Sequence, residues 1–165
     1  MNENKVAALT SAFLELPVSP DVRPFLTSLS DDKSLHHKFA RHTYVHANAP
    51  LSVMDALITA NAGTLGVFFD SPKYIKSVDT TVKKFKPHRD AYVDFALSAG
   101  VQDKDCVLIT SHSWDVVGAK RAGWRTVWVD RGGEGWCDGL GTGMGIHPDW
   151  TIKSLQDMGN VFSVM

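Results

Sequence analysis

The 165-residue chain has few cysteines, no excess of one charge and no long hydrophobic run, and each absence excludes a class of protein. Two cysteines are too few for the disulfide framework of small secreted proteins. A formal net charge of −1 favours neither nucleic acid nor a membrane surface. No apolar run reaches the roughly 18 residues of a membrane helix, and the N-terminal residues do not resemble a signal sequence. We therefore expect a cytoplasmic protein with no nucleic-acid partner and no membrane contact.

The composition is typical of one globular domain, with 44% apolar and 21% charged residues. A chain of this length can bury most of its surface on folding, so a single domain is expected over residues 1–165. No spacing of cysteine and histidine matches a zinc site, and no cofactor or metal is expected. The seven histidines and five tryptophans could line a site, although core packing and surface positions explain them as well.

Hydrophobic periodicity predicts helices alternating with strands. The expected helices cover residues 5–16, 21–29, 52–62, 87–99, 115–122 and 154–158. The expected strands cover residues 39–46, 106–110, 126–129 and 151–152, with short apolar pieces at 66–69 and 74–78. The glycine-rich residues 131–145 predict a long loop. Alternation of this kind with short connections indicates an α/β fold, a parallel sheet with helices on both faces.

Two segments carry a resemblance to a known family: KPHRDAY at residues 86–92 and VLITSHSWDVVGAKRAGWRTVWVDR at residues 107–131. Together they resemble the rear half of the catalytic site of 2-haloacid dehalogenases, in the haloacid dehalogenase (HAD) superfamily. The segments LPVSPDVRPFLTSL, FFDSPKYIKSVDTTVKK and HPDWTIKSLQDM resemble other parts of the same core. The resemblance implies a Rossmannoid parallel sheet, with residues 1–16 as the remnant of a cap helix.

The resemblance also assigns residues. Lys86 matches the lysine that neutralises charge beside the family's nucleophile, and Tyr92 matches a tyrosine near the dehalogenase active site. Asp115 matches the family's acidic residue, and Asn48 matches its asparagine. Ala47 replaces the family's Ser or Thr, so that hydroxyl is lost.

Two further positions depart from the family at the end of the 106–110 strand. Thr110 stands where dehalogenases have serine, which is a mild change. His112 stands where they have asparagine, which is a large one.

The family's nucleophile motif, Asp-x-Asp-Gly-Thr or Asp-x-Tyr-Gly-Thr, does not occur in the chain. Asp70 follows a similar apolar strand, but its spacing to Lys86 fits a later family segment. Covalent hydrolysis needs a carboxylate nucleophile, and phosphoryl transfer in this family needs Mg²⁺ held by paired carboxylates. The expectation is therefore a protein that is not a standard dehalogenase or phosphatase.

The missing motif also belongs to the central strand of the family's sheet. Either the flanking strands at 39–46 and 106–110 pair directly, or another segment such as the apolar tail 161–165 fills the gap. An exposed sheet edge would favour a homodimer.

The candidate site lies beyond the carboxyl ends of the strands, where open α/β sheets bind ligands. The residues expected to donate hydrogen bonds or act as acid and base are Lys86, His112, Tyr92 and His46. The residues expected to contact substrate are Asn48, Thr110, Ser111, Ser113, Trp114 and Asp115. Structural alternatives are open: the histidines could satisfy loop backbone groups, Asp115 could cap a helix, and Lys86 and Asp115 could form a structural salt bridge.

Several functions are compatible with this pattern. The first is a cofactor-free cyclase, isomerase or lyase, pericyclic reactions included, that acts on a hydrophobic small molecule in secondary metabolism. The second is a pseudoenzyme that binds a ligand or partner without catalysis. The third is a 2-haloacid dehalogenase-like hydrolase with a relocated carboxylate nucleophile, such as Asp70 or Asp79. The fourth is a fragment of a longer gene product.

Overall fold

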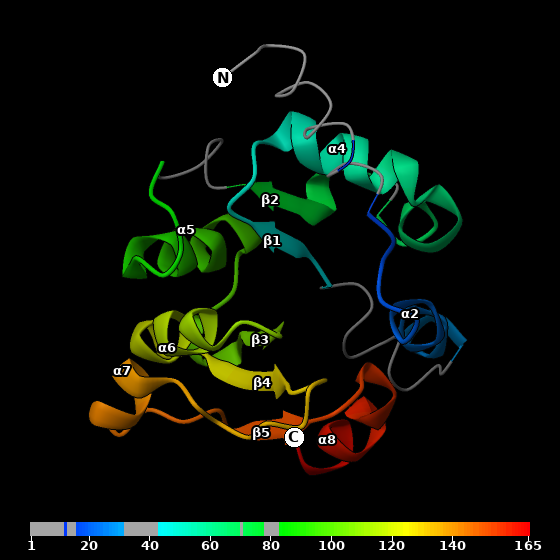
Figure 1. Ribbon diagram of the computed structural model, residues 1–165. Helices are drawn as coiled ribbons and strands as arrows, with labels where there is room; N and C mark the ends of the chain where they lie inside the picture. Colours follow the sequence, from blue (N-terminus) through cyan, green and yellow to red (C-terminus); the bar gives the residue numbers. More distant parts are fainter. Residues whose placement is uncertain (1–11, 13–15, 32–42, 70, 78–82) are drawn as a thin grey trace. The chain divides into compact units, whose positions relative to one another are not determined.

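The computed structural model describes residue 12 and residues 16–31, 43–69, 71–77 and 83–165. The chain divides into two compact units, Met1–Thr80 (unit 1) and Thr81–Met165 (unit 2). The described strands form two parallel sheets, β1-β2 in unit 1 and β3-β4-β5 in unit 2 (Figure 1). The single domain stays a prediction. Most of the predicted cap-helix remnant, and most of the predicted helix 5–16, lies outside the described residues.

Unit 1 contains a short parallel pair of strands with helices beside it. Strand β1 (Val45–Ala47) pairs with β2 (Ile75–Ser77), and the Ser77 hydroxyl donates to the carbonyl of Ala49 at 2.6 Å. The helices and turns are α2 (Val22–Asp31), α4 (Leu51–Ala60), the π-helical η2 (Ala62–Gly66) and the 3₁₀ turn η3 (Pro72–Tyr74). The predicted strand 39–46 is therefore found only at its end, and residues 39–42 lie outside the described part of the chain.

Unit 2 contains a three-stranded parallel sheet with β4 in the middle. Its strands are β3 (Val107–Thr110), β4 (Arg125–Val129) and β5 (Trp150–Ile152). The core follows β4, where Val127, Trp128 and Val129 are at most 6% exposed. Strand β3 pairs with β4 along its whole length, and of its residues Leu108 is buried and the other three are half-buried.

Two helices of unit 2, α5 (Arg89–Ala99) and α6 (Ser113–Ala122), pack against each other (Figure 1). Each ends at the residue that the sequence predicted and is followed by a glycine in the left-handed region, Gly100 at φ 71° and Gly123 at φ 95°. Helix α5 begins two residues later than predicted, because the His88 side chain caps it by accepting from the Asp90 N–H at 3.2 Å. The 3₁₀ turn η4 (Asp103–Asp105) joins α5 to β3.

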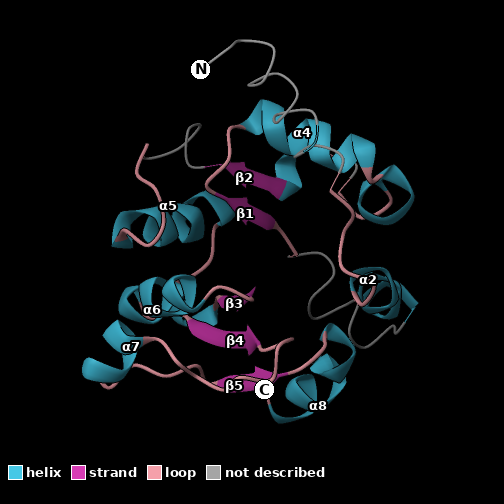
Figure 2. Ribbon diagram, viewed as in Figure 1, coloured by secondary structure: helices cyan, strands magenta, loops and turns pink. Residues whose placement is uncertain are grey.

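The C-terminal part of unit 2 is more helical than the sequence suggested. The glycine-rich loop contains a short helix, α7 (Gly139–Gly143), capped by Asp138. After β5 come the 3₁₀ turn η5 (Leu155–Asp157) and helix α8 (Met158–Val164) (Figure 2).

The suggestion that the tail 161–165 fills a gap in the sheet as a strand is wrong. Ser154 and Asp157 form a capping box that starts the helical segment. Met158 and Val161 are both buried, and they are three residues apart, so they share one face of α8. A strand would have placed them on opposite faces.

Candidate functional site

A buried lysine, aspartate and tyrosine form the polar centre of unit 2. The Lys86 Nζ donates to Asp115 Oδ2 at 2.8 Å, and the Tyr92 hydroxyl donates to Asp115 Oδ1 at 2.6 Å. The same hydroxyl also lies 3.2 Å from the Asp115 carbonyl oxygen. The exposed fractions are 8% for Lys86, 3% for Asp115 and 0% for Tyr92. Both oxygens of the carboxylate therefore accept a hydrogen bond inside the protein.

The close approach of α5 and α6 brings these three side chains together. Tyr92 lies on α5, Asp115 lies in the first turn of α6, and Lys86 lies just before α5. Gly118 of α6 faces Tyr92: a Cβ at this position would overlap the tyrosine hydroxyl and lie 2.8 Å from the Cβ of Pro87. A glycine is needed here because any side chain would push the two helices apart.

Burial, together with the negative charge of Asp115 and the hydrogen bond to it, raises the pKa of Tyr92 well above its usual range. Tyr92 is therefore a neutral hydrogen-bond donor at physiological pH and not a general base. Asp115 has both oxygens engaged, so it is poorly placed to attack a substrate itself. Its position suits it to orient Lys86.

The chain turns from β3 into α6 at Ser111 and His112, which form a corner beside this cluster. The Thr110 hydroxyl accepts from the N–H of His112 at 3.1 Å, and the carbonyl of Ser111 accepts from the indole N–H of Trp128 at 3.4 Å. His112 is the N-cap residue of α6, and its exposed ring stacks on Trp114 with centroids 5.4 Å apart. Ser113 is the first residue of the helix.

One structural alternative for Asp115 is wrong. Asp115 does not cap α6, because it is the third residue of the helix and its own N–H donates to the carbonyl of His112 at 3.1 Å. The expected salt bridge between Lys86 and Asp115 is confirmed.

The remaining predicted residues lie in unit 1. His46 belongs to β1 and Asn48 follows it, at the carboxyl end of that strand; both are half-buried and both make further contacts. Unit 1 is described by itself. Asp70 and Asp79, the candidate relocated nucleophiles, lie outside the described residues.

Sequence reasoning missed two features of unit 2. Asp130 is buried at the end of β4 and accepts hydrogen bonds from backbone N–H groups of the following loop. The available signal was an aspartate directly after an apolar strand, with two glycines beginning two residues later. Gly118 had no such signal, because nothing local in the sequence marks a helix crossing.

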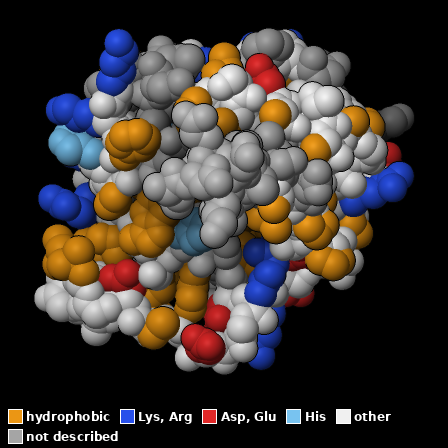
Figure 3. Space-filling model, turned by 45° about the horizontal axis from the view of Figure 1, so that its top comes forward, with side chains coloured by type: hydrophobic (Ala, Val, Ile, Leu, Met, Phe, Trp, Pro, Cys, Tyr) orange, Lys and Arg blue, Asp and Glu red, His pale blue; other side chains and the backbone are white. Residues whose placement is uncertain are grey.

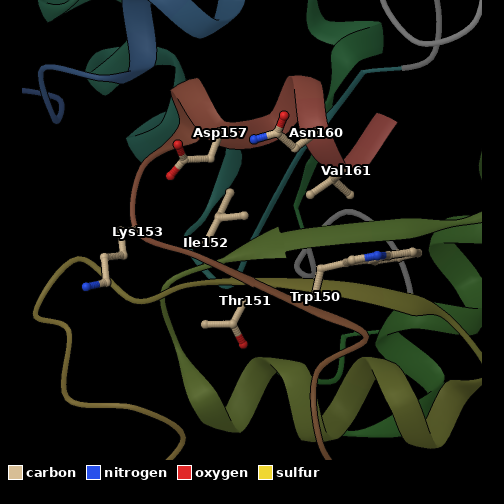
Figure 4. Close-up of a pocket in the computed structure, with 7 residues that line it drawn as sticks. All are labelled: Trp150, Thr151, Ile152, Lys153, Asp157, Asn160 and Val161. Carbon is tan, nitrogen blue, oxygen red and sulfur yellow. The ribbon is translucent and has the colours of Figure 1, made fainter. Parts of the chain in front are cut away.

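A surface pocket of about 400 Å³ lies between β5 and the C-terminal helical segment (Figure 4). Its lining residues are Trp150, Thr151, Ile152, Lys153, Asp157, Asn160 and Val161. None of the predicted site residues is among them. The pocket is thus separate from the polar cluster.

Other features of the described residues' surface do not indicate a second site. Figure 3 shows hydrophobic side chains that reach the surface in several places, and the largely exposed ones of unit 2 include Phe85, Leu97, Leu140, Met144 and Val164. In the described ranges, no three His, Cys, Asp or Glu side chains gather as a metal site would require. No helix in the same ranges is long and apolar enough to cross a membrane.

Comparison with known proteins shows which proteins this chain resembles. A HAD-hydrolase-like family matches residues 85–158, the stretch that contains Lys86, Tyr92 and Asp115. Haloacetate dehalogenase H-2 of Moraxella sp. (strain B) is 25% identical over 163 residues, which cover 99% of this chain and 65% of that protein. The (S)-2-haloacid dehalogenase of Pseudomonas sp. (strain YL) is 29% identical over 93 residues, covering 56% of this chain and 38% of that protein.

Solved structures show the same fold. The crystal structure of a dehalogenase with an intermediate complex matches 98% of this chain and 64% of its own, with a TM-score of 0.76 and 23% identity. L-2-haloacid dehalogenase from Xanthobacter autotrophicus matches 100% of this chain and 69% of its own, with a TM-score of 0.73 and 24% identity. The matched segment thus resembles the HAD-hydrolase-like family, and the structure shares the mixed α/β fold of parallel sheets and helices seen in the dehalogenase structures. By sequence the chain is similar to 2-haloacid dehalogenases.

These relatives correct one expectation and weaken another. The expectation that the protein is not a standard dehalogenase is wrong, because both curated relatives are dehalogenases and one aligns with nearly the whole chain. That expectation failed because it inferred activity from a single absent motif. A cyclase, isomerase or lyase activity, a role in secondary metabolism and a pseudoenzyme role find no support among these relatives.

Proposed function

We propose that this chain is a haloacid dehalogenase-like hydrolase that removes halide from short 2-haloacids. The observation that carries the proposal is the buried Lys86–Asp115–Tyr92 cluster, which lies within the segment that resembles the HAD-hydrolase-like family. The proposal concerns the activity of the whole protein, of which this chain spans 65% of the first relative's length. The predicted homodimer and cytoplasmic location stay predictions.

In this proposal Lys86 stabilises the negative charge of the reacting carboxylates. An ammonium has three N–H donors, and Asp115 accepts from one of them at 2.8 Å. The carboxylate of a haloacid and the carboxylate of a nucleophile are both anions that a buried ammonium stabilises. Asp115 and Tyr92 are positioning residues, because Tyr92 fixes one carboxylate oxygen while the other orients Lys86.

The proposed reaction is a two-step substitution. A carboxylate oxygen attacks the carbon that bears the halogen, the carbon–halogen bond breaks, and halide leaves with the electron pair. Water then attacks the carbonyl carbon of the resulting ester, which releases a 2-hydroxyacid, regenerates the carboxylate and yields a proton. The candidate nucleophiles within this chain are Asp70 and Asp79. His112 is exposed beside Trp114 and is proposed as a substrate contact at the mouth of the site.

Halide release from 2-chloropropionate and from haloacetate tests the proposal. The wild-type chain should release halide, and Lys86→Met should lower kcat/KM by about a hundredfold or more, since an electrostatic contact of this kind supplies a few kcal/mol. Lys120→Met is the matched control, because Lys120 also pairs with an aspartate but lies at the opposite end of α6. Its activity should equal that of the wild type.

Two further variants locate the nucleophile. Halide release should vanish in either Asp70→Asn or Asp79→Asn and persist in the other. If the folded wild type releases no halide from either acid, or if Lys86→Met retains full activity, the proposed function is wrong.

A further inference from the structure

Asp130 holds the loop that follows β4. Its carboxylate accepts from the N–H groups of Gly133 at 3.0 Å, Glu134 at 3.2 Å and Gly135 at 3.0 Å. The residue is only 8% exposed, and its own N–H donates to the carbonyl of Ile152 at 2.7 Å. A buried carboxylate with several backbone donors fixes the local chain path strongly, because releasing any donor would leave a charged group less satisfied.

The fixed loop leads directly into Trp136. The ring of Trp136 meets the ring of Trp128 edge to face, with centroids 5.2 Å apart and an interplanar angle of 85°. The buried indole N–H of Trp136 has no hydrogen-bond partner in the described part of the chain. Ring packing and the path of the loop therefore determine where Trp136 lies.

Trp128 connects this pair to the candidate site. It is 6% exposed within β4, and its indole N–H donates to the carbonyl of Ser111 at 3.4 Å. Ser111 precedes His112, which caps α6, and the first turn of that helix carries Asp115. A continuous set of contacts thus runs from Asp130 through two tryptophans to the corner that bears the site.

We propose that Asp130 is a positioning residue for the active site: its loop holds Trp136 against Trp128, and Trp128 fixes the Ser111–His112 corner. Asp130 acts on this corner through other residues and touches no reacting atom. Only the kinetic part of this inference rests on the proposed dehalogenase function. The structural part holds for any ligand that binds at the corner.

The first test compares Asp130→Ala with Asp149→Ala. Both aspartates accept backbone N–H bonds at an end of β4, but Asp149 binds Thr126 at the amino end and not the loop that leads into Trp136. Two tryptophans in edge contact give a coupled circular dichroism signal. Loss of this signal in Trp136→Phe should show that it arises from the pair Trp128 and Trp136. We expect Asp130→Ala to lose this signal and Asp149→Ala to keep it.

The second test follows the corner itself by hydrogen exchange. Exchange in a peptide that spans residues 108–115 should accelerate in Asp130→Ala and in Trp136→Ala, and should match the wild type in Asp149→Ala. Asp130→Asn keeps one oxygen that can accept from Gly133 and Glu134, so it should restore part of the protection. This variant also carries the test if Asp130→Ala does not fold.

The kinetic test uses halide release. Displacement of the corner should lower kcat by about tenfold to a hundredfold in Asp130→Ala, with a smaller change in KM, as expected when reacting groups are misplaced by about an ångström. Absence of halide release from the wild type would defeat the proposed function but leave the exchange and dichroism tests valid. Unchanged exchange in Asp130→Ala, or an equal change in Asp149→Ala, would overturn the positioning role.

Discussion

The two ends of helix α6 carry ion pairs of nearly equal length in different surroundings. At the end near the site, Lys86 and Asp115 are 2.8 Å apart, and their side chains are 6% and 4% exposed. At the other end, Lys120 and Asp149 are 2.7 Å apart, and their side chains are 28% and 27% exposed. Distance therefore does not distinguish the two pairs. Burial does distinguish them. A buried charge that loses its partner costs several kcal/mol of stability, by the order of magnitude known for buried pairs. A charge pair exposed to water is screened and contributes little.

The neighbours of each pair differ as well. Asp115 accepts its second hydrogen bond from the Tyr92 side chain, whereas Asp149 accepts from the backbone N–H and hydroxyl of Thr126. A pair held by buried side chains has a fixed geometry, which suits chemistry. A half-exposed pair beside a strand suits local stability.

The largest difference should appear when one lysine is removed. Lys86→Met leaves a buried, unpaired carboxylate and should lower the free energy of unfolding by about 3–5 kcal/mol. Lys120→Met should lower it by about 0–1 kcal/mol, because Asp149 stays partly solvated. Urea denaturation followed by tryptophan fluorescence measures both. Equal losses in the two variants would show that burial does not separate the pairs.

The double variant Lys86→Met, Asp115→Leu sharpens this comparison. Replacing both charges with apolar groups should recover much of the stability, since no charge is left unpaired. It should not recover halide release. Recovery of both would mean that the buried pair has no chemical role.

Two glycines give the next largest contrast. Gly118→Ala places a Cβ against the Tyr92 hydroxyl and Pro87, so it should cost about 1–3 kcal/mol and weaken the hydrogen bond to Asp115. Gly159→Ala, in α8, meets nothing within 4 Å and should be neutral or stabilising by up to about 1 kcal/mol. Thermal melting compares the two. A Gly118→Ala protein as stable as the wild type would contradict the close helix contact.

The smallest expected effect is a pH response of opposite sign at the two ends. The pKa of Tyr92 is raised above its ordinary value of 10.0, and burial is the largest cause. The stability that Tyr92 contributes is therefore present below pH 10.0 and is lost as pH rises through the higher pKa of the folded protein. Burial raises the pKa of Asp149, but hydrogen bonds from Lys120 and Thr126 outweigh it and leave the pKa lowered. The stability that Asp149 contributes is present above pH 3.8, its pKa in the unfolded chain, and is lost as pH falls through the lower pKa of the folded protein.

Stability curves against pH separate these two groups. Tyr92→Phe should flatten the loss of stability above pH 10.0 and leave the acid limb unchanged. Asp149→Asn should flatten the loss below pH 3.8 and leave the alkaline limb unchanged. A tyrosine variant with an altered acid limb would show that the two ends are coupled.

Much of unit 2 could be predicted from local patterns. The strands predicted at 106–110 and 126–129 are found with bounds that differ by one residue. Gly100 and Gly123 end their helices because only glycine enters the left-handed region at low cost. The Lys86–Asp115 salt bridge was also expected, from the resemblance rather than from spacing. The tail at 161–165 was predicted less well, because a short apolar run fits a strand or a buried helix equally.

The sequence by itself determined the resemblance to haloacid dehalogenases, the order of the strands and of the two packed helices in unit 2, and the identity of the lysine and aspartate in the candidate site. These features depend on local periodicity, capping and motif, which neighbouring residues encode. Only the tertiary structure decided that Tyr92 binds Asp115, that Gly118 permits it, and that Asp130 fixes the loop of Trp136. Each of these depends on contacts or burial that arise when separate elements pack together, and no local pattern specifies which side chains then meet.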